Sequence, residues 1–475
     1  MKILWIIVLF GGVGMIKIRK VISVFLALSV LISFSGCSLE FSSFENLMRP
    51  PKLIGKYQGL QDAFEETVND PFTLITPENG DLQSSFLTVD VDADGDEEAI
   101  VMYALNDNPE IAKVSYFEYS DEEWNHITTL DGLGGSVDKV IVDDFNNDGL
   151  SEVLIGWLLY SSKTNRAFSE YSLDSDSFTQ IATYPYTHFD VVDANGDGYS
   201  DVLALTVESS VPDNLTATAR IYNFDQQSKC LSLYGETAMD GGISSYSSVS
   251  VETVQDKNII YIESNKGLNE SVTEVIYWDD DINKLVSPLF DIATQSTYQT
   301  WRNMKLSVYD VDSDGFLEIP TSVDMPGSVV TNTDTSNSSS TITSDKQPAT
   351  KMYFTKWVKF RNDKLTPVQY SIVNTTLKYM LKIKSTWVGK ITVLGNNGQW
   401  DFYRWNASRG VVGDLLFSIY AYDNSDNESK DKYVGYQVLK TTSSKTYVSQ
   451  ISNAGLDFGI SNDWLESNFI LTDFG

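Results

Sequence analysis

The sequence predicts a mainly β protein built from repeated sheets, and two observations carry this prediction. One nine-residue acidic pattern occurs four times, and short β-prone runs flank the copies. The copies begin at residues 90, 144, 193 and 310, so their spacings are 54, 49 and 117 residues, the last about two periods long. A period of about 50 residues is typical of arrays in which each unit buries its apolar face against its neighbours.

Each acidic pattern has the oxygen spacing of a calcium loop. Side chains at positions one, three, five and nine and the carbonyl at position seven can bind a hard cation, while the glycine at position six permits the turn. The residues at these five positions are Asp90, Asp92, Asp94, Asp96 and Glu98; Asp144, Asn146, Asp148, Leu150 and Glu152; Asp193, Asn195, Asp197, Tyr199 and Asp201; and Asp310, Asp312, Asp314, Phe316 and Glu318. We therefore expect up to four structural calcium sites.

The loops are not EF-hands. An EF-hand needs a bidentate Glu at position twelve and a helix on each side. Position twelve is here Val101, Ile155, Ala204 or Thr321. The flanks are β-prone instead, so each loop is predicted to connect two strands. Lead-in strands are expected at 86–89, 139–142, 188–192 and 306–309, and lead-out strands at 99–103, 153–157 and 202–205.

A fifth unit without the acidic spacing is predicted inside the long gap. Residues 248–251 and 259–262 have the strand pattern, and 252–258 would connect them. Two further strands are expected in every unit. The third strands are predicted at 114–119, 167–173, 219–224, 275–278 and 352–360, and the fourth near Trp124, Phe178, Leu231, Leu285 and Val368. Four short strands per unit favour a β-propeller, whose closure protects sheet edges.

The loops and their strands, over residues 84–372, resemble the FG-GAP or VCBS repeats of integrin-type propellers. This resemblance implies a calcium loop between two strands of a blade. The Phe-Gly-Gly-Ala-Pro stretch of one such family is absent. Five repeats are visible, and five to seven blades are compatible with the sequence. Residues 72–75 or the C-terminal region are the candidates for ring closure.

The N-terminus carries an export signal. Lys17, Arg19 and Lys20 precede the apolar run 21–34 and then Ser35-Gly36-Cys37. A basic segment, a short apolar segment and small residues before a cut are typical of a signal peptide, here 1–36. Cys37 makes the cut resemble a bacterial lipobox, so we expect a lipid anchor on Cys37 and a tether over 37–54; a plain signal-anchor helix is the alternative. A start at Met15, with 1–14 untranslated, is a further hypothesis.

Composition agrees with an extracytoplasmic, lipid-anchored protein, most simply of a Gram-positive bacterium. The formal net charge is −31, which argues against nucleic acid as a partner. Acylation of Cys37 would leave Cys230 as the single thiol, so no internal disulfide is expected. The expected partners are the membrane, through the lipid, and an unknown surface protein or glycan.

The propeller region is assigned to 55–372, with a helix over 60–68 and a mobile polar loop over 327–350. Residues 373–475 are assigned to a smaller α+β domain, with two degenerate blades as the alternative. A short helix is expected around 377–383, and a final helix over 463–469 capped by Ser461 or Asn462. Antiparallel strands are expected at 387–394, 399–405, 415–422, 433–440 and 446–451. Trp387, Trp400, Tyr403 and Trp405 are interpreted as core, the alternative being a carbohydrate-stacking platform.

Catalysis has little support in the sequence. The two histidines, His126 and His188, lack zinc spacing, and no Gly-x-Ser-x-Gly elbow is present. His188 is interpreted as structural. We therefore expect no enzyme activity and predict a ligand- or partner-binding module. The alternative is a polysaccharide-active or other extracellular enzyme that uses the central face of the propeller. The shape and lining of a central pocket would discriminate between the two.

Overall fold

The computed structural model describes residues 56–91, 93–160, 165–174, 177–211, 214–331, 350–396 and 398–472. The predicted signal peptide, lipidation site and tether lie outside these residues, as do 332–349 of the predicted mobile loop. The chain comprises two units, Met1–Asp62 and Ala63–Gly475. None of the helices in the described ranges is long and apolar enough to span a membrane.

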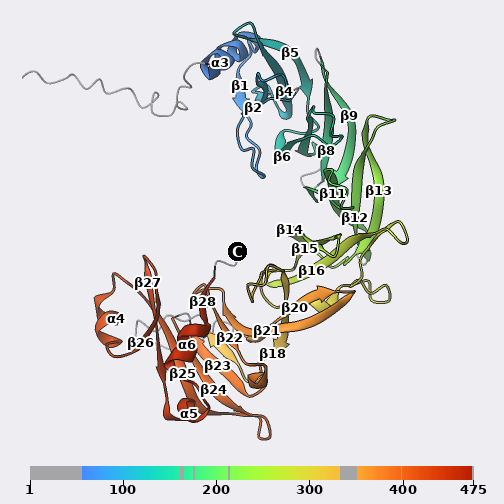
Figure 1. The fold of residues 1–475 in the computed structure, drawn as a ribbon. Coiled ribbons are helices and arrows are strands. Elements are labelled where there is room, and N and C mark those ends of the chain that lie inside the picture. The colour runs from blue at the N-terminus through green and yellow to red at the C-terminus, as the bar shows by residue number, and fades with distance from the viewer. Residues whose placement is uncertain are drawn as a thin grey trace, which may run out of the picture. The chain divides into compact units, whose positions relative to one another are not determined.

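The protein is mainly β, and the strands of the described part form six sheets that follow one another along the chain (Figure 1). The first sheet contains β1 (Phe72–Leu74), β2 (Phe86–Val89), β3 (Glu98–Leu105), β4 (Asn108–Ser120) and β5 (Glu123–Asp131). β1 and β2 both pair with β3, at Tyr103–Leu105 and Glu98–Val101 respectively. Residues 72–74 thus extend the edge of the first sheet, and they do not close a ring.

Helix α3 (Lys56–Thr67) confirms the helix predicted over 60–68. Its residue Phe64 is fully buried and makes edge-to-face contacts with Phe72, Phe86 and Tyr103, with ring centroids 5.0, 5.6 and 5.1 Å away. Such contacts add about 0.5–1.5 kcal/mol per pair to the burial of the ring. This packing holds the C-terminal half of the helix on the first sheet.

The second and third sheets are regular antiparallel meanders of four strands. The second contains β6 (Ser136–Asp143), β7 (Glu152–Leu158), β8 (Arg166–Asp174) and β9 (Ser177–Tyr186); the third contains β10 (His188–Val192), β11 (Asp201–Val211), β12 (Asn214–Asp225) and β13 (Cys230–Met239). In both sheets, as in the first, the acidic loop connects the lead-in strand to the next strand of the meander. The predicted strand–loop–strand units are confirmed here.

The fourth sheet confirms the predicted metal-free unit. It contains β14 (Ser245–Val254), β15 (Lys257–Lys266), β16 (Glu270–Asp279) and β17 (Lys284–Val286). β14 and β15 are longer than expected and meet in a two-residue turn at Gln255 and Asp256, whose φ angles are +51° and +66°. Two positive φ angles are typical of a type I′ hairpin turn, which needs no ion.

The fifth sheet contains β18 (Glu318–Asp324), β20 (Tyr353–Arg361), β21 (Lys364–Asn374), β22 (Tyr379–Ile383) and β28 (Phe469–Leu471). The helix expected around 377–383 is wrong, because β22 lies between β21 and β28 as a buried strand. A short apolar run does not by itself distinguish a buried strand from a helix. The assigned boundary between 372 and 373 falls inside β21.

The expected lead-in strand at 306–309 is also wrong. Only Tyr309 bridges to Glu318. Upstream of it, the backbone is held by side chains: the Val308 N–H donates to Glu263 Oε1 at 2.9 Å, and the Leu306 carbonyl accepts from Arg302. The segment's polar groups therefore bond to side chains instead of completing a ladder.

The sixth sheet is antiparallel apart from its first edge strand. It contains β19 (Val329–Thr331), β23 (Ile391–Asn396), β24 (Gln399–Asn406), β25 (Val411–Asp423), β26 (Gln437–Thr441) and β27 (Lys445–Ile451). β19, from the start of the predicted mobile loop, pairs in parallel with β23. The strands β23 to β27 therefore form one sheet instead of two degenerate blades. The helical segments around it are η2 (Ser385–Trp387), α4 (Asn427–Lys432), α5 (Asn453–Asp457) and α6 (Asn462–Asn468), with Ser461 capping α6 as predicted.

Consecutive sheets pack face to face through shared apolar cores. One core joins the first and second sheets around Trp157, another joins the second and third around Phe168, and a third joins the third and fourth around Ile260. Further cores join the fourth to the fifth sheet and the fifth to the sixth. In the described ranges neither a closed propeller nor its blade number is established.

Candidate functional site

The four acidic loops share one backbone conformation. Glycine at position six has φ between +85° and +95° in every copy. Position four is also left-handed, with φ of +59° at Ala93, +54° at Asn147, +77° at Gly196 and +63° at Ser313. The common fold of these loops confirms that the repeated sequence pattern encodes a repeated structure.

The acid at position nine is buried in all four loops and closes each loop with one hydrogen bond. These side chains, Glu98, Glu152, Asp201 and Glu318, are at most 8 % exposed. Each accepts a hydrogen bond from the backbone N–H of position two, at 2.9, 3.1, 2.9 and 2.9 Å in chain order. Position two is itself buried and apolar in every copy. The acid is therefore both a loop clamp and a candidate ligand.

Burial of these acids has an electrostatic consequence. Desolvation, reinforced by the neighbouring loop carboxylates, raises the pKa of Glu152 to about 7 and that of Asp201 to about 7. Burial also raises the pKa of Glu318. A bound cation would favour the ionised form of such acids, because an opposite charge nearby offsets desolvation.

The aspartates at positions one and five accept hydrogen bonds from the backbone of their own loop. The position-one aspartates accept the N–H of the position-six glycine, over 2.9–3.2 Å, and the position-five aspartates accept the N–H of position seven, over 2.8–3.1 Å. These bonds turn the carboxylates inward. Every carboxylate oxygen has two lone pairs, so an oxygen that accepts an N–H can still bind a metal.

The position-three ligands differ between the loops. Asp310, Asp312 and Asp314 of the fourth loop place ligand oxygens within 4.8 Å of one another, the one such acidic group found in the described residues. The second and third loops carry Asn146 and Asn195 there, and both amides bond within their own loops. Asp92 of the first loop lies outside the described residues.

This donor set fits a calcium ion. It combines carboxylate and amide oxygens with a backbone carbonyl, the ligands that calcium prefers, on a turn that two left-handed residues hold open. Asp90, Asp94 and Asp96 of the first loop are exposed, whereas Glu98 is buried. The side chains at position seven in the other loops, Leu150, Tyr199 and Phe316, are exposed, so only their carbonyls are candidate ligands.

Neighbouring loops contact one another. Ser151 of the second loop donates its N–H to the Val91 carbonyl of the first at 2.8 Å. Next to the metal-free hairpin, Asn258 donates to the Asp193 carbonyl of the third loop at 2.8 Å, and Glu252 accepts the N–H of Leu317 in the fourth at 2.8 Å. The hairpin thus continues the row of loops without ligands of its own.

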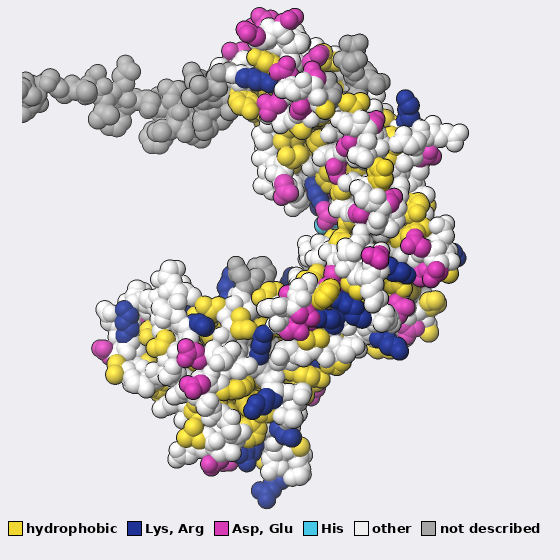
Figure 2. All heavy atoms as spheres, viewed as in Figure 1, with side chains coloured by type: hydrophobic (Ala, Val, Ile, Leu, Met, Phe, Trp, Pro, Cys, Tyr) yellow, Lys and Arg dark blue, Asp and Glu magenta, His cyan; other side chains and the backbone are white. Residues whose placement is uncertain are grey.

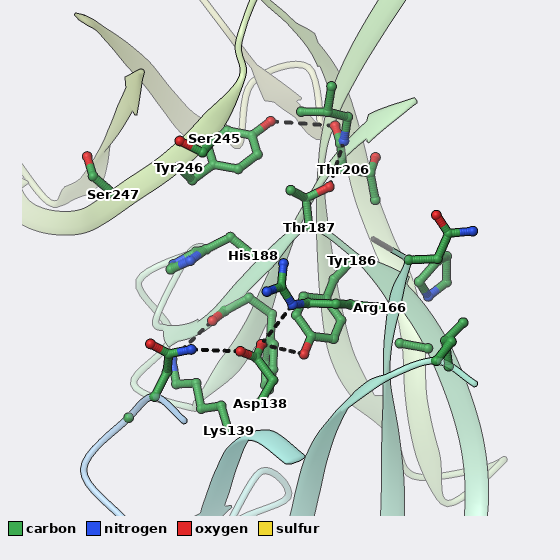
Figure 3. Close-up of a pocket in the computed structure, with 18 of the residues that line it drawn as sticks. Asp138, Lys139, Arg166, Tyr186, Thr187, His188, Thr206, Ser245, Tyr246 and Ser247 are labelled. Carbon is green, nitrogen blue, oxygen red and sulfur yellow. Dashed lines mark hydrogen bonds and ion pairs between the residues drawn. The ribbon is translucent and has the colours of Figure 1, made fainter. Parts of the chain in front are cut away.

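A cavity of about 1190 Å³ lies at the opposite ends of the same lead-in strands (Figure 3). Residues near the starts of β6, β10 and β14 line it, together with parts of β8, β9 and β11. Its charged or titratable side chains are Asp138, Lys139, Arg166, His188, Tyr186 and Tyr246, and its hydroxyl groups come from Thr187, Thr206, Ser244, Ser245 and Ser247. The volume is ample for an organic ligand.

Asp138 organises one side of this cavity. It accepts hydrogen bonds from Tyr186 Oη at 2.6 Å and from Asn79 Nδ2 at 2.7 Å, and Arg166 Nε lies 3.6 Å away. Burial and the adjacent Asp138 raise the pKa of Tyr186, so this phenol is a hydrogen-bond donor at neutral pH. The Arg166 side chain is one third exposed and extends toward the cavity in Figure 3.

Asp190 organises a second side. Its two oxygens contact Lys139 and His188, with His188 Nε2 at 3.1 Å. Burial opposes ionisation of Asp190, but the hydrogen bonds from His188 and Lys139 outweigh it and hold its pKa below the ordinary value. Lys139 and His188 are thereby fixed at the cavity wall.

The sequence did not indicate this cavity. His188, which the sequence analysis interprets as structural, is held by Asp190 and also lines the cavity, and no sequence motif indicates Lys139, Arg166 or Tyr186. The sequence does contain a pattern that indicates a shared wall. Polar residues at the starts of successive lead-in strands occupy equivalent places in successive sheets. His126, on β5, instead bonds Thr129 Oγ1 at 2.8 Å. Trp387 and Trp400 belong to the core as expected, while Tyr403 and Trp405 are partly exposed.

Comparison with known proteins gives distant structural similarity only. No family model and no curated protein matches the chain. A rhamnogalacturonan lyase of Bacillus licheniformis is 12% identical, with a TM-score of 0.29, over 52% of this chain and 58% of that one. The exotype rhamnogalacturonan lyase YesX is 10% identical, with a TM-score of 0.29, over 73% and 83% of the two chains. Sqt1 of Saccharomyces cerevisiae is 9% identical, with a TM-score of 0.26, over 76% and 85%.

These comparisons correct one expectation. The chain was expected not to be an enzyme, and that expectation is contradicted, because rhamnogalacturonan lyases are among the solved structures it is similar to. The chain spans about 58% of the length of the Bacillus licheniformis enzyme. Membership in the FG-GAP or VCBS families is not confirmed. At these identities and TM-scores, no activity is carried over to this chain.

Proposed function

We propose that this chain is a lipid-anchored protein of the extracytoplasmic membrane face, whose calcium-stabilised, propeller-type repeats present a cavity that binds an acidic saccharide. The membrane is reached through Cys37, and the calcium ions are held by the acidic loops. The lining of the cavity is the observation that supports the proposal most strongly. The alternative ligand, a surface protein, would need a larger contact than the cavity walls provide.

Charge supports an acidic ligand. The whole chain carries −31, and acidic side chains lie over much of the face seen in Figure 2. The cavity lining differs from this average, because it contains Lys139, Arg166 and His188 with one carboxylate, Asp138, while the Asp190 carboxylate contacts Lys139 and His188 next to the lining. In an acidic protein, a local cluster of cationic groups is the arrangement that attracts an anion.

Arg166 is the best-placed group for a carboxylate. Its Nε lies 3.6 Å from Asp138, which already accepts from Tyr186 and Asn79, and the side chain as a whole is one third exposed at the cavity wall. A guanidinium whose carboxylate partner also accepts hydrogen bonds from other groups still has N–H donors for a ligand. The hydroxyl groups of Thr187, Ser245 and Ser247 would then serve sugar hydroxyls.

Direct titration calorimetry tests this proposal. Uronic-acid oligosaccharides should bind in the presence of calcium, and their reduced, uncharged counterparts should not. Arg166→Gln should weaken binding by about 2 kcal/mol, the size of a charge-assisted hydrogen bond. Arg404→Gln, an arginine on β24 of the sixth sheet and outside the cavity lining, is the matched control and should bind normally. Equal binding of charged and reduced oligosaccharides, or no effect of Arg166→Gln, would refute the proposal.

Cleavage of the same saccharide is a second candidate function. The observation favouring it is the pair His188–Asp190, in which a carboxylate 3.1 Å from the ring orients a group suited to proton transfer beside Arg166. Incubation of acidic polysaccharides with the protein, followed by product sizing, tests for cleavage. Loss of any cleavage in His188→Gln, with binding retained, would support this role, and intact polysaccharide with the wild-type protein would exclude it for the substrates tested.

A further inference from the structure

The fourth acidic loop contains a positive charge supplied by the protein itself. Lys359, on β20, pairs directly with Glu318, the ninth residue of that loop. Its ammonium forms an ion pair with Asp314 Oδ2 and lies 3.1 Å from Glu318 Oε1. The lysine thus contacts the residues at ligand positions five and nine.

The ammonium occupies oxygens that are candidate ligands for a metal. Asp314 Oδ1 accepts the N–H of Phe316 at 3.1 Å, and Glu318 Oε2 accepts the N–H of Val311 at 2.9 Å. The remaining oxygen of each carboxylate faces Lys359. An ammonium and a calcium ion would therefore compete for the same pair of atoms.

In the other three loops, the residue that pairs with the ninth position is not a lysine. Extending the antiparallel register of their sheets by one residue places Glu118, Ser172 and Asn223 opposite the ninth residue. None of these residues carries a positive charge. The close gathering of Asp310, Asp312 and Asp314, the one such acidic group among the described residues, accords with an internal counter-charge. Lys382 adds a second cation, which donates to the Val311 carbonyl at 2.5 Å.

We propose that Lys359 takes the place of calcium in the fourth loop, so that this loop stays closed without the ion while the first three depend on it. The inference rests on the calcium part of the proposed function. The four loops would then respond differently to calcium depletion. The first three loops would open, and the fourth loop, 310–318, would stay closed. Calcium would bind the fourth loop only by displacing the ammonium.

Hydrogen exchange with mass spectrometry tests this, on the full mature chain with excess calcium or excess chelator. Amide protection of 144–152 and 193–201 should fall by about tenfold or more in chelator, a typical coupling. Protection of 310–318 should stay the same. In Lys359→Met, 310–318 should become calcium-dependent like the others. Lys356→Met, three residues earlier on the same strand, is the control and should leave 310–318 independent of calcium.

The possible failures are distinguishable. Equal calcium dependence of the second, third and fourth loops in the wild-type protein would overturn the role of Lys359 and leave the calcium proposal standing. Calcium independence of every loop would overturn both. If Lys359→Met does not fold, Lys359→Gln, which keeps a polar side chain, gives the same test. Continued calcium independence of 310–318 in a folded Lys359 variant would also overturn the inference.

Discussion

The backbone N–H of Ala194 lies 2.9 Å from Asp201 Oδ2, and this one hydrogen bond ties the second residue of a calcium-type loop to its ninth. Equivalent bonds recur in the other three loops. The second residue is apolar and buried, so the bond lies away from solvent. It links the exposed ligand rim to the core between the sheets. A change of charge on the exposed loop carboxylates therefore affects the packing of the strands.

Removal of a ninth-position acid should destabilise the folded chain. Glu152→Ala leaves the Phe145 N–H buried without an acceptor, a loss of about 1–3 kcal/mol. Urea unfolding in excess calcium measures the change. Thr179→Ala, at an exposed position of β9 in the same sheet, is the control and should stay within about 0.5 kcal/mol of wild type. Equal stability of the Glu152 variant and wild type would show that the clamp does not contribute.

A buried carboxyl outside the loops should make stability depend on pH. Glu274 is fully buried and accepts hydrogen bonds from the Asp240 N–H at 2.8 Å and Thr297 Oγ1 at 2.9 Å. Burial raises its pKa to about 7, whereas the pKa in the unfolded chain is about 4.3. Between these values the folded chain binds a proton that the unfolded chain has lost. Stability should therefore fall as the pH rises from about 4.3 to 7, by roughly 4 kcal/mol at most from this group.

Glu274→Gln checks the sign of that dependence. Glutamine keeps the shape and cannot ionise, so the variant should lose the part of the slope that Glu274 contributes. Urea unfolding at several pH values between 5 and 7 measures this, with the exposed Glu123→Gln as control. An unchanged slope in Glu274→Gln would assign the pH dependence to other groups.

Lipid attachment is a separate prediction about residues 1–54. Cys37→Ala should release the protein from the membrane fraction or stall its processing, because a diacyl group supplies the buried methylenes that hold an exported chain on a bilayer. Fractionation of cells and mass spectrometry of the mature N-terminus measure the outcome. Cys230→Ala, at the other cysteine, should leave localisation unchanged. A peptide spanning Met1 to Lys17, recovered intact, would contradict the start at Met15.

Much of the fold could be predicted from the sequence because its signals are local. The acidic loops fix a turn within nine residues, and the flanking β-prone runs give the strands on either side. The period and the strand pattern of 248–251 and 259–262 predict the unit that contains the hairpin at Gln255 and Asp256, and its four-stranded sheet is confirmed. The buried helix residue Phe64 was found from its spacing with Leu60 on one helix face.

The remainder depends on contacts between distant parts of the chain. Residues 379–383 pair along their whole length with β21, and 379–381 also pair with β28, which lies about 90 residues later in the chain. Residues 306–308 are held by Glu263 and Arg302 instead of a partner strand, and no local pattern encodes that choice. The cavity likewise brings together Lys139, Arg166 and His188 from three strands. Sequence spacing alone does not place side chains on such a shared wall.

The melting temperature of the mature chain in excess calcium and in excess chelator tests the central claim most directly. Without a cation, the carboxylates of the first three loops repel one another, and buried ninth-position acids such as Glu152 and Asp201 must protonate or open the loop. We predict a lower melting temperature in chelator, and Asp148→Ala and Asp197→Ala in calcium should each reproduce part of that loss. The same melting temperature in chelator and in calcium would contradict the account.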